Sequence, residues 1–438
     1  MPINLMARAR HAGAAVLFLG GASCTDFLTV PNPTLIDAGA INPAADAPIL
    51  ANSAQQNFAT SYGLLIMYAG WMTGETQVAE TFPTRNEFGR RDIVNTNGSL
   101  SADVWTPLAR TLSEARFVLA LSLPTPATNL VRAQVALYSA YGFLFMAEHF
   151  CGGAVGGGPL ILTAAMLDSA VANFSIAISI GRAAAAAPGA LAATVTLANQ
   201  YANIAFVGRA RAQLQAGRPA LAAQDADSVS AGFTYSLPYV DDLANRTRLA
   251  NTMHQFTRDR GSIMVAPAYR TGSTVALGGL GGRADPRVTW VNGAGLGFSA
   301  QDASSGTFFV QRKYTGYADG IRLASKLETD YIKAEATGGT AGQLALIALR
   351  RTAAGDTAYT LPVTASGVLT ELMNQKAFDF YLEGKRLGDL RRNPANVTNA
   401  PTPGAVYFKG GFPVNGSRVC YPIPNTETDN NPNHPSTP

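Results

Sequence analysis

The stretch FDFYLEGKRLGDLRR, residues 378–392, carries more chemical information than any other part of the chain of its length. In a helix, Glu383, Arg386 and Asp389 lie at three-residue steps and share one face. That face permits two interpretations: an acid/base site with an anion clamp, or a partly buried ion-pair network that locks the segment to its neighbours. We favour the structural ion-pair network and predict no catalytic residues, since such networks perturb charged groups without any catalytic role.

Helical patterning dominates the first half of the chain and returns near this stretch. Apolar and small residues recur at three- and four-residue steps between about residues 45 and 233, a spacing typical of packed helices. The pattern predicts helices at Pro48–Ala69, Ser101–Leu121, Thr128–Phe150, Ala164–Ala187, Ala192–Ala216 and Pro219–Ala231. Later helices are predicted at Leu327–Thr337, Gly342–Arg351 and Gly367–Arg391.

The last two helices of the first half resemble one tetratricopeptide repeat, a hairpin of antiparallel helices. Gly217 lies at the turn between them, and Ala210 and Ala222 lie where the helices touch and need small side chains. Val229 stands where the repeat prefers Ala, and the two preceding helices form a looser pair of the same kind. We therefore predict a mainly α fold, built as a tetratricopeptide-like helical-repeat scaffold.

The composition changes in residues 236–323, where Gly, Ser, Thr and aromatic residues dominate. We predict a long irregular region with short strands, and long irregular segments are usually functional. The tail, residues 393–438, is rich in Pro and Asn and predicts extended and turn-like structure. The predicted organisation is a signal peptide (1–23), an extended leader (24–44), an N-terminal helical-repeat part (45–235) and a C-terminal part with the loop-rich ligand region (236–438), the last two packed as one domain.

Residues 1–23 have the pattern of a secretory signal. Arg8 and Arg10 precede an apolar run at residues 12–19, and four small residues then lead to Cys24, without any acidic residue. A basic start, a short apolar run and small residues at the end are typical of such signals. The alternative is an ordinary N-terminal core helix.

The residues before Cys24 resemble a bacterial lipobox, in which the cysteine is lipidated and becomes the first residue of the mature chain. Gly21 stands where a large aliphatic residue is usual. Acyl chains hold a protein at a membrane because each buried CH₂ contributes about 0.8 kcal/mol. The most apolar later stretch, residues 131–150, is interrupted by Arg132, Gln134, Glu148 and His149, so we expect a protein that is anchored through Cys24 and does not span the membrane.

The three cysteines are an odd number for an exported chain. With Cys24 assigned to the lipid, Cys151 and Cys420 remain as an even pair in an oxidising compartment. We predict that they form a disulfide, with two separate buried thiols as the alternative.

Composition and motifs argue against several other classes of protein. Only 14% of the 438 residues are charged, the net charge is +4 and no stretch is densely basic, whereas a nucleic-acid binder normally presents a clustered basic face. The glycine runs lack the end of a phosphate-binding loop, and the four histidines show no metal-ligand spacing. We expect no nucleic acid, cofactor or metal. Carboxylate pairs for glycoside cleavage meet in space, and no pair stands out in the sequence.

Segments spread over the chain resemble the SusD/RagB family of surface lipoproteins. Residues 378–392 are similar to its E-x-x-F-E-G-x-R-x-x-D-L-R-R signature. The other similar segments are Cys24-Thr-Asp-Phe-Leu, Tyr141–Phe150 with Pro159-Leu160, Asp285-Pro-Arg287, Arg322-Leu-Ala with Ala334-Glu-Ala336, and Tyr421-Pro-Ile-Pro424 with Asn430–Asn433. The sequence departs from the family pattern at Ser325 or Lys326, at Lys376 and Ala377, and at Gly388.

The resemblance implies a nutrient-binding lipoprotein of the outer membrane, exposed at the cell surface. Such a protein captures an oligosaccharide or related nutrient and delivers it to its partner, a SusC-like TonB-dependent transporter, without being an enzyme. Two alternatives remain: a tetratricopeptide-like protein-interaction scaffold without a small-molecule ligand, and a secreted polysaccharide hydrolase.

Aromatic residues are the candidates for ligand contact, because an aromatic face packs against the apolar face of a sugar ring. The loop region offers Trp290, Phe298, Phe308, Phe309, Tyr314 and Tyr317. The helical part adds Trp71, Phe82 and Trp105.

Overall fold

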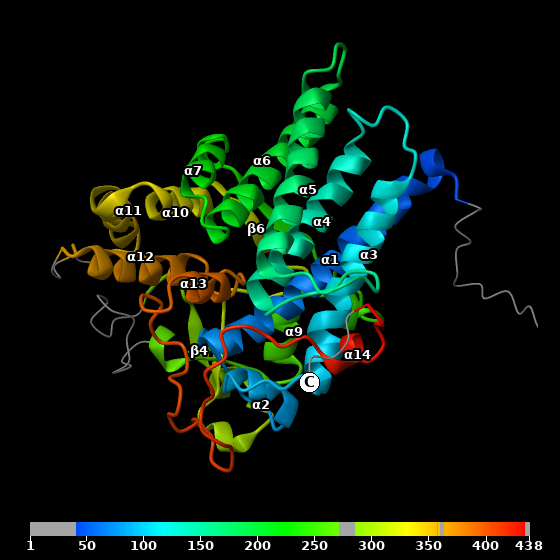
Figure 1. The fold of residues 1–438 in the computed structure, drawn as a ribbon. Coiled ribbons are helices and arrows are strands. Elements are labelled where there is room, and N and C mark those ends of the chain that lie inside the picture. Colours follow the sequence, from blue (N-terminus) through cyan, green and yellow to red (C-terminus); the bar gives the residue numbers. More distant parts are fainter. Residues whose placement is uncertain (1–40, 271–284, 357, 360–362, 434–438) are drawn as a thin grey trace, which may run out of the picture. The chain divides into compact units, whose positions relative to one another are not determined.

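The helices of the first half follow the predicted pattern closely. They are α1 (Pro43–Thr73), α3 (Thr106–Ala120), α4 (Leu130–His149), α5 (Thr163–Ala185), α6 (Ala192–Gln215) and α7 (Pro219–Asp227). From α3 to α7 each helix packs against the next one along the chain, and Figure 1 shows α4, α5 and α6 side by side. This arrangement is the helical-repeat scaffold that the sequence predicts.

The computed structural model describes residues 41–270, 285–356, 358–359 and 363–433. The predicted signal peptide, Cys24 and almost all of the predicted leader lie outside the described residues. The part of the chain that begins at Pro43 forms one compact unit.

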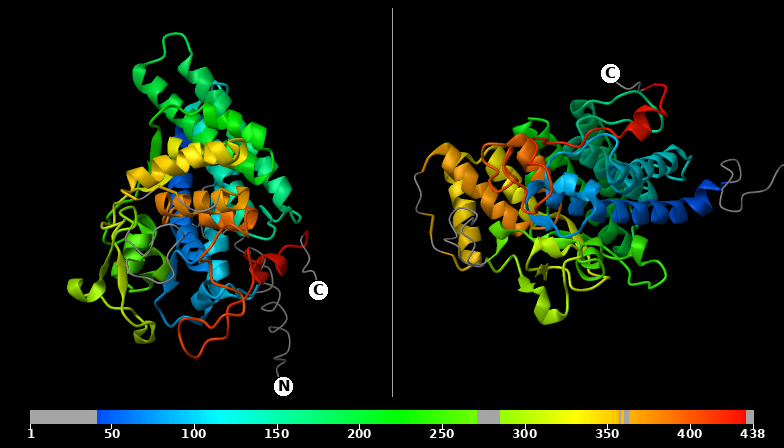
Figure 2. Two further views of the ribbon diagram at one scale, coloured as in Figure 1. Left: turned by 90° about the vertical axis from the view of Figure 1, so that its left-hand side faces the viewer. Right: turned by 90° about the horizontal axis from the view of Figure 1, so that it is seen from below.

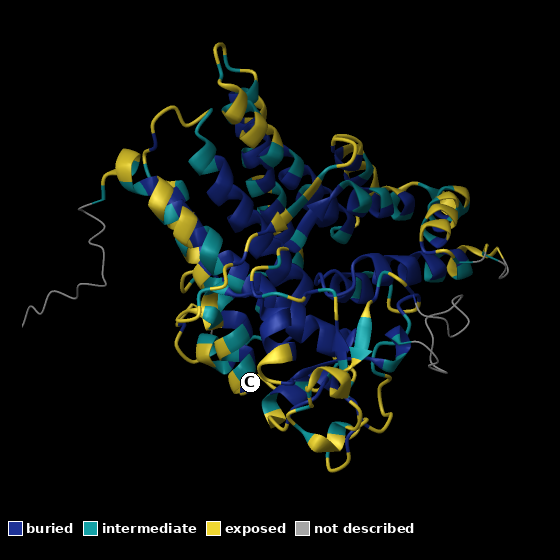
Figure 3. Cartoon of the chain, turned by 180° about the vertical axis from the view of Figure 1, so that it is seen from behind, coloured by how far each residue is buried: buried dark blue, intermediate teal, exposed yellow. Residues whose placement is uncertain are grey.

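The centre of the core is formed by α1 and α4. Every residue from Ala133 to His149 is buried, and in Figure 3 buried residues concentrate in the middle of the cartoon while the helix tips and outer loops are exposed. Aromatic rings interlock here: the rings of Tyr62 and Phe145 stack with their centroids 5.2 Å apart. By length and hydropathy α4 and α5 are each apolar enough to cross a membrane. However, 83% of the most apolar stretch of α4 is buried inside the fold, as in a core helix.

Small residues set the close approach of α5 and α6. A Cβ atom at Gly208 of α6 would lie 2.2 Å from the ring of Phe174 on α5, so the ring occupies the space that a side chain would need. At the α6–α7 hairpin Ala210 and Ala222 are fully buried, where the tetratricopeptide resemblance places its contact residues.

Three two-stranded antiparallel ribbons occur in the described residues. β1 (Thr76–Val78) pairs with β3 (Ile263–Val265), β2 (Thr234–Leu237) pairs with β6 (Ile321–Ser325), and β4 (Trp290–Asn292) pairs with β5 (Phe309–Gln311). Short helices that the sequence pattern does not reveal lie between them: α2 (Pro83–Gly89), α8 (Arg246–Leu249) and α9 (Thr252–Arg258).

The C-terminal helices are α10 (Lys326–Ala336), α11 (Gly339–Ala353), α12 (Ala365–Asp379), α13 (Arg386–Arg392) and α14 (Asn425–Thr428). The prediction of one helix over residues 367–391 is wrong, because the helix stops at Asp379 and restarts at Arg386. Between them Leu382 and Gly384 have φ angles of 54° and 66°, a left-handed backbone that no α-helix contains. Apart from α14, the tail after α13 consists of turns and irregular chain, and in Figure 2 it lies beside the N-terminal helices in both views.

Candidate functional site

The break between α12 and α13 places Glu383 in a buried turn. Its carboxylate lies 2.5 Å from Lys313 Nζ and 2.8 Å from the guanidinium of Arg322. Burial raises the pKa of Glu383, but the positive charges of Lys313, Arg322 and Lys385 together outweigh burial and hold this pKa below its usual value. An ionised, doubly paired carboxylate is suited to holding elements together and unsuited to proton transfer.

Asp389 and Arg386 contact other partners. Asp389 Oδ1 lies 2.6 Å from Lys376 Nζ and 2.8 Å from the guanidinium of Arg392. Arg386 donates a hydrogen bond to the carbonyl oxygen of Thr398. Glu383, Arg386 and Asp389 therefore fasten α13 and the turn before it to different neighbours, as expected for a structural ion-pair network.

A polar hollow of about 580 Å³ opens beside Glu383. Charged residues dominate its lining, which includes Arg287, Lys313, Arg322, Asp319, Asp379 and Glu383. The buried acids are already bonded: Asp379 accepts from Arg350 at 2.7 Å, and Glu383 is paired as described above. A ligand would have to compete with these ion pairs, so we do not place the binding site here.

Several aromatic candidates are committed to contacts within the protein. Phe308, Tyr314, Tyr317 and Trp71 are all buried. The hydroxyl of Tyr314 donates to the carbonyl oxygen of Leu382 at 3.1 Å, and that of Tyr317 donates to Asp259 at 2.5 Å. Trp71 and Tyr314 each line a hollow, and the one that Tyr314 lines is the polar hollow beside Glu383.

The other candidates lie nearer the surface. Trp290 and Phe309 face each other across the β4–β5 ribbon, in an edge-to-face contact with ring centroids 5.4 Å apart. The guanidinium of Arg270 covers the Phe309 ring at 3.8 Å. Phe298 is half-buried, Phe82 is 50% exposed and Trp105 is buried.

A second hollow, which we name the Trp71 cavity, has a different chemistry. It encloses about 210 Å³ between the end of α1, the β1–β3 ribbon and the tail. None of its lining residues is charged, and most are apolar. They are Trp71, Gly74, Thr76, Gln77, Val78, Gly89, Ala266, Pro267, Ala268, Asn399, Pro401, Val406, Tyr407, Phe408 and Asn415.

Three lining residues of the Trp71 cavity carry a buried polar atom that has no hydrogen-bond partner among the described residues. They are the indole Nε1 of Trp71, the hydroxyl of Thr76 and Oδ1 of Asn415. A buried polar group without a partner costs about 1–3 kcal/mol, and native proteins keep few of them. All three atoms are inaccessible to solvent, the space of the cavity included, so a ligand would reach them only after the cavity wall moves.

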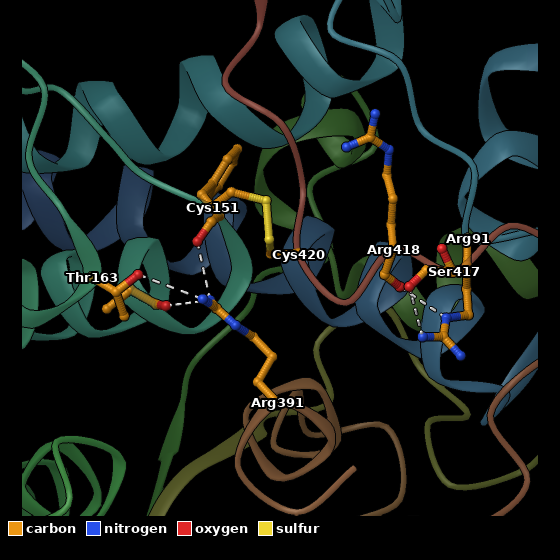
Figure 4. Close-up of a disulfide and its surroundings, with 9 residues drawn as sticks. Arg91, Cys151, Thr163, Arg391, Ser417, Arg418 and Cys420 are labelled. Atoms are coloured by element: carbon orange, nitrogen blue, oxygen red, sulfur yellow. Dashed lines mark hydrogen bonds between the residues drawn. A yellow bond between two sulfur atoms is a disulfide. The ribbon is translucent and has the colours of Figure 1, made fainter.

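The tail forms the outer wall of the Trp71 cavity and is tied down at several points. Tyr407 donates to Asn86 Oδ1 at 2.9 Å, and Lys409 Nζ donates to the carbonyl oxygen of Glu80 at 2.6 Å. Arg91 donates to the carbonyl oxygens of Pro401, at 3.0 Å, and of Arg418, at 2.9 Å, and Figure 4 shows its side chain reaching residues 417 and 418. The wall is therefore held in place by bonds to the α2 region.

Cys151 and Cys420 form a disulfide that joins positions 269 residues apart (Figure 4). The backbone is paired beside it, since the N–H of Tyr421 donates to the carbonyl of His149 at 2.7 Å and the N–H of Cys151 donates back to Tyr421 at 2.9 Å. The disulfide thus fixes the tail five residues after Asn415, a lining residue of the cavity.

The sequence reasoning missed the tail residues of the site. Tyr407 and Phe408 lie in a segment expected only to be extended, yet the run AVYFKGGF at 405–412 holds three aromatic residues close together, a signal that could have drawn attention. The described residues contain no group of three or more His, Cys, Asp or Glu that could hold a metal ion.

Comparison with known proteins shows the fold. No family model matches the sequence, and no curated protein matches it. Among solved structures, a SusD superfamily protein from Bacteroides vulgatus is 15% identical, with a TM-score of 0.58 over 89% of this chain and 97% of that one. A SusD-like carbohydrate-binding protein from Bacteroides fragilis is 13% identical, with a TM-score of 0.60 over 89% of this chain and 98% of that one.

A laminarin-binding SusD-like protein is 14% identical, with a TM-score of 0.54 over 90% of this chain and 98% of that one. The chain therefore has the mainly α SusD-like fold, and the prediction of that fold from the sequence is confirmed.

Proposed function

We propose that this chain, with its SusD-like fold, is a carbohydrate-binding protein that holds a sugar ring in the Trp71 cavity. The observation that carries the proposal is an uncharged cavity whose lining combines aromatic and apolar residues with the amide residues Gln77, Asn399 and Asn415. Aromatic faces suit the apolar face of a sugar ring, and a few placed polar groups suit its hydroxyls. Solved proteins of similar fold, which bear names such as carbohydrate-binding or laminarin-binding, support this ligand class.

We further propose that the protein works outside the cell as a lipoprotein. Cys24 carries the lipid and anchors the chain at the outer membrane, and a SusC-like TonB-dependent transporter receives the bound oligosaccharide. The lipobox resemblance and the signal pattern support the anchor, and the family resemblance supports the partner. Recovery of such a transporter with the lipidated protein from bacterial membranes tests the partner, and failure to recover one contradicts it. The chain acts by binding, without catalysis.

The experiment for the ligand is a binding screen of the mature protein against neutral oligosaccharides, followed by titration of two variants. Phe408→Ala removes a lining aromatic that is 37% exposed, so it should weaken binding about tenfold, as expected for loss of an aromatic stacking face. Phe82→Ala removes an aromatic that is 50% exposed and outside the cavity lining, and it should leave affinity unchanged.

Two results would overturn the proposal. One is a failure of every oligosaccharide to bind to a protein that is folded by circular dichroism. The other is an equal effect of Phe408→Ala and Phe82→Ala, which would move the ligand away from the Trp71 cavity.

A further inference from the structure

We propose that the polar hollow beside Glu383 is a second binding site, which takes the carboxylate of an acidic sugar such as a hexuronic acid. The choice of a carboxylate follows from the hollow itself, and the choice of a sugar rests on the proposed function. Such a ligand leaves the ion pairs of the hollow intact, because it binds to donors that these pairs do not use.

Lys313 and Arg322 share a single acid. Both bond Oε1 of Glu383, at 2.5 Å and 2.8 Å, so the ammonium and the guanidinium lie next to each other. Within the described residues neither of them forms an ion pair with another acid. Two cations and one carboxylate leave a surplus of one positive charge. Because partly buried charges are favourable when they are paired, this surplus suits one monovalent anion.

The other buried acid of the hollow is balanced by its own partners. Asp379 lies 2.7 Å from the guanidinium of Arg350 and 3.2 Å from that of Arg287. Arg287 in turn lies 2.6 Å from Asp285. Two guanidiniums and two carboxylates meet here, so this side of the hollow does not change the surplus beside Glu383.

Asp319 is the third acid of the lining, and its charge opposes an anion. Its Oδ2 accepts from the backbone N–H groups of Thr315 and Gly316, at 2.6 Å and 2.8 Å. The carboxylate is thus held on the turn that contains it. Asp319 therefore lowers the affinity for an anion without occupying the donors of Lys313 and Arg322.

Arg322 offers unused donors to the hollow. Its Nε and Nη2 donate to Glu383 and to the carbonyl oxygen of Asp379, so the two N–H groups of Nη1 have no partner among the described residues. The side chain of Arg322 is 26% exposed, and Nη1 is not among the buried atoms that lack a partner. A ligand can therefore reach this nitrogen without any movement of the wall.

Lys313 has one unused donor and an incompletely compensated charge. Its ammonium carries three N–H groups, of which one is given to the carbonyl oxygen of Tyr381, at 2.6 Å, and one to Glu383, at 2.5 Å. Burial lowers the pKa of Lys313 and outweighs the raising effect of Glu383. A carboxylate in the hollow would accept from the third N–H and add the missing negative charge.

The remaining polar side chains of the lining are Tyr314 and Ser236. Tyr314 is buried and donates to Leu382. Ser236 is exposed and lies directly opposite Arg322 in the β2–β6 ribbon. Residues opposite each other in an antiparallel pair share a face, with Cβ atoms about 4.5–5.5 Å apart. A substitution at Ser236 can thus act on Arg322 without touching any ion pair.

Matched pairs of methyl glycosides test the inference on the mature protein, by NMR titration at low salt. We compare the methyl glycosides of D-galacturonic acid and D-galactose, and those of D-glucuronic acid and D-glucose. Within each pair the only difference is a carboxylate in place of the hydroxymethyl group. In at least one pair the acidic member should bind about tenfold more tightly, and added salt should weaken its binding. Acetate, a carboxylate without a ring, should bind about tenfold more weakly than this acidic glycoside.

Variants of the rim locate the site. Ser236→Glu should weaken binding of the acidic glycoside about tenfold, because the new carboxylate lies beside Arg322 and takes the place of the ligand. Ser236→Gln has the same size without the charge, so the gap between these two variants isolates the charge. Asp319→Asn should strengthen binding about twofold to threefold by removing a repelling charge. Thr196→Glu, at an exposed residue of α6 outside the lining, should leave affinity unchanged.

The outcomes separate this inference from the proposed function. With the variants folded by circular dichroism, equal affinity within both pairs overturns the second site, as do equal affinities of Ser236→Glu and Ser236→Gln. Acetate that binds as tightly as the acidic glycoside overturns the assignment to a sugar. Loss of acidic-glycoside binding in Phe408→Ala also overturns the second site. Binding of the acidic glycoside that is sensitive to Ser236→Glu, in a protein that binds no neutral oligosaccharide, supports the second site and contradicts the proposed ligand of the Trp71 cavity.

Discussion

Glu75 is a buried acid whose pKa is strongly changed by the fold. It lies between Gly74 and Thr76, which both line the Trp71 cavity, and only 1% of it is exposed. Its carboxylate accepts from the N–H of Leu382 at 3.0 Å and from the hydroxyl of Thr73 at 3.3 Å. Burial raises the pKa of Glu75 to about 7, against the smaller lowering effect of Arg386.

This shift predicts that the free energy of unfolding falls as pH rises. The pKa in the folded state is above the unfolded value of 4.5, so the folded chain binds the proton more tightly and is favoured below pH 4.5. Between pH 4.5 and about 7 that advantage is lost, by about 3 kcal/mol in total. Glu75→Gln, which cannot ionise, should therefore be more stable than the wild type at pH 8 and not at pH 4, as measured by urea unfolding.

The wild type must be compared with Glu75→Gln because His149 changes the free energy of unfolding with pH in the opposite direction. Burial lowers the pKa of His149 from 6.5 to about 3, so its contribution to stability rises with pH between these values. The wild type and Glu75→Gln share the contribution of His149. The difference between their free energies of unfolding therefore reports on Glu75. A difference that does not change with pH would contradict the assignment.

For single residues, the sequence indicates which side chains can contact a ligand better than it indicates which of them meet in the folded chain. Trp71 was a candidate from its type alone, and it does line the cavity. Tyr407 and Asn415 were missed because they meet Trp71 across more than 300 residues of chain, a separation at which local patterns carry no information. Gly388, a departure from the family pattern, lies where a Cβ atom would come within 2.9 Å of the Glu148 carboxylate.

Among the elements, the α5–α6 pair shows most clearly how a glycine sets packing. Gly208→Ala should lower the free energy of unfolding by about 1–3 kcal/mol, because the new methyl group would overlap the Phe174 ring. Gly342→Ala, in α11 with open space around it, should raise stability by about 0.5–1 kcal/mol through helix propensity. Thermal unfolding of the two variants checks both signs, and a stabilising Gly208→Ala would show that α5 and α6 are less closely packed.

The helices were predicted to within a few residues at most ends because their periodicity is local and long. The predicted helix over 367–391 failed for a physical reason. Residues 380–385 keep a helix-like pattern, but Leu382 and Gly384 adopt a left-handed backbone and Glu383 pairs with Lys313 and Arg322. Gly384 is the local signal for a stop, whereas the distant partners of Glu383 cannot be read from a local pattern.

At the scale of the whole molecule, the disulfide and the cavity are linked. Replacing both Cys151 and Cys420 by Ser should lower the free energy of unfolding by about 3–5 kcal/mol, since the bond closes a very long loop. The tail wall ends near Cys420, so ligand affinity should fall as well. Chemical unfolding and titration of a bound oligosaccharide measure the two effects.

The control for this prediction is a count of thiols in the mature wild-type protein, denatured without reductant. A lipidated Cys24 and a disulfide leave no free thiol. Two free thiols would contradict the pairing of Cys151 with Cys420.

The span of the disulfide also determines what a protease can do to this protein. The bond joins Cys151 to Cys420, so a single cut anywhere between them leaves both fragments in one covalent molecule. The loop-rich region and all the tail residues that line the cavity lie inside that span, and α1 lies before it. A protease can therefore cut an exposed loop within this span, and the disulfide still keeps the pieces of the cavity together.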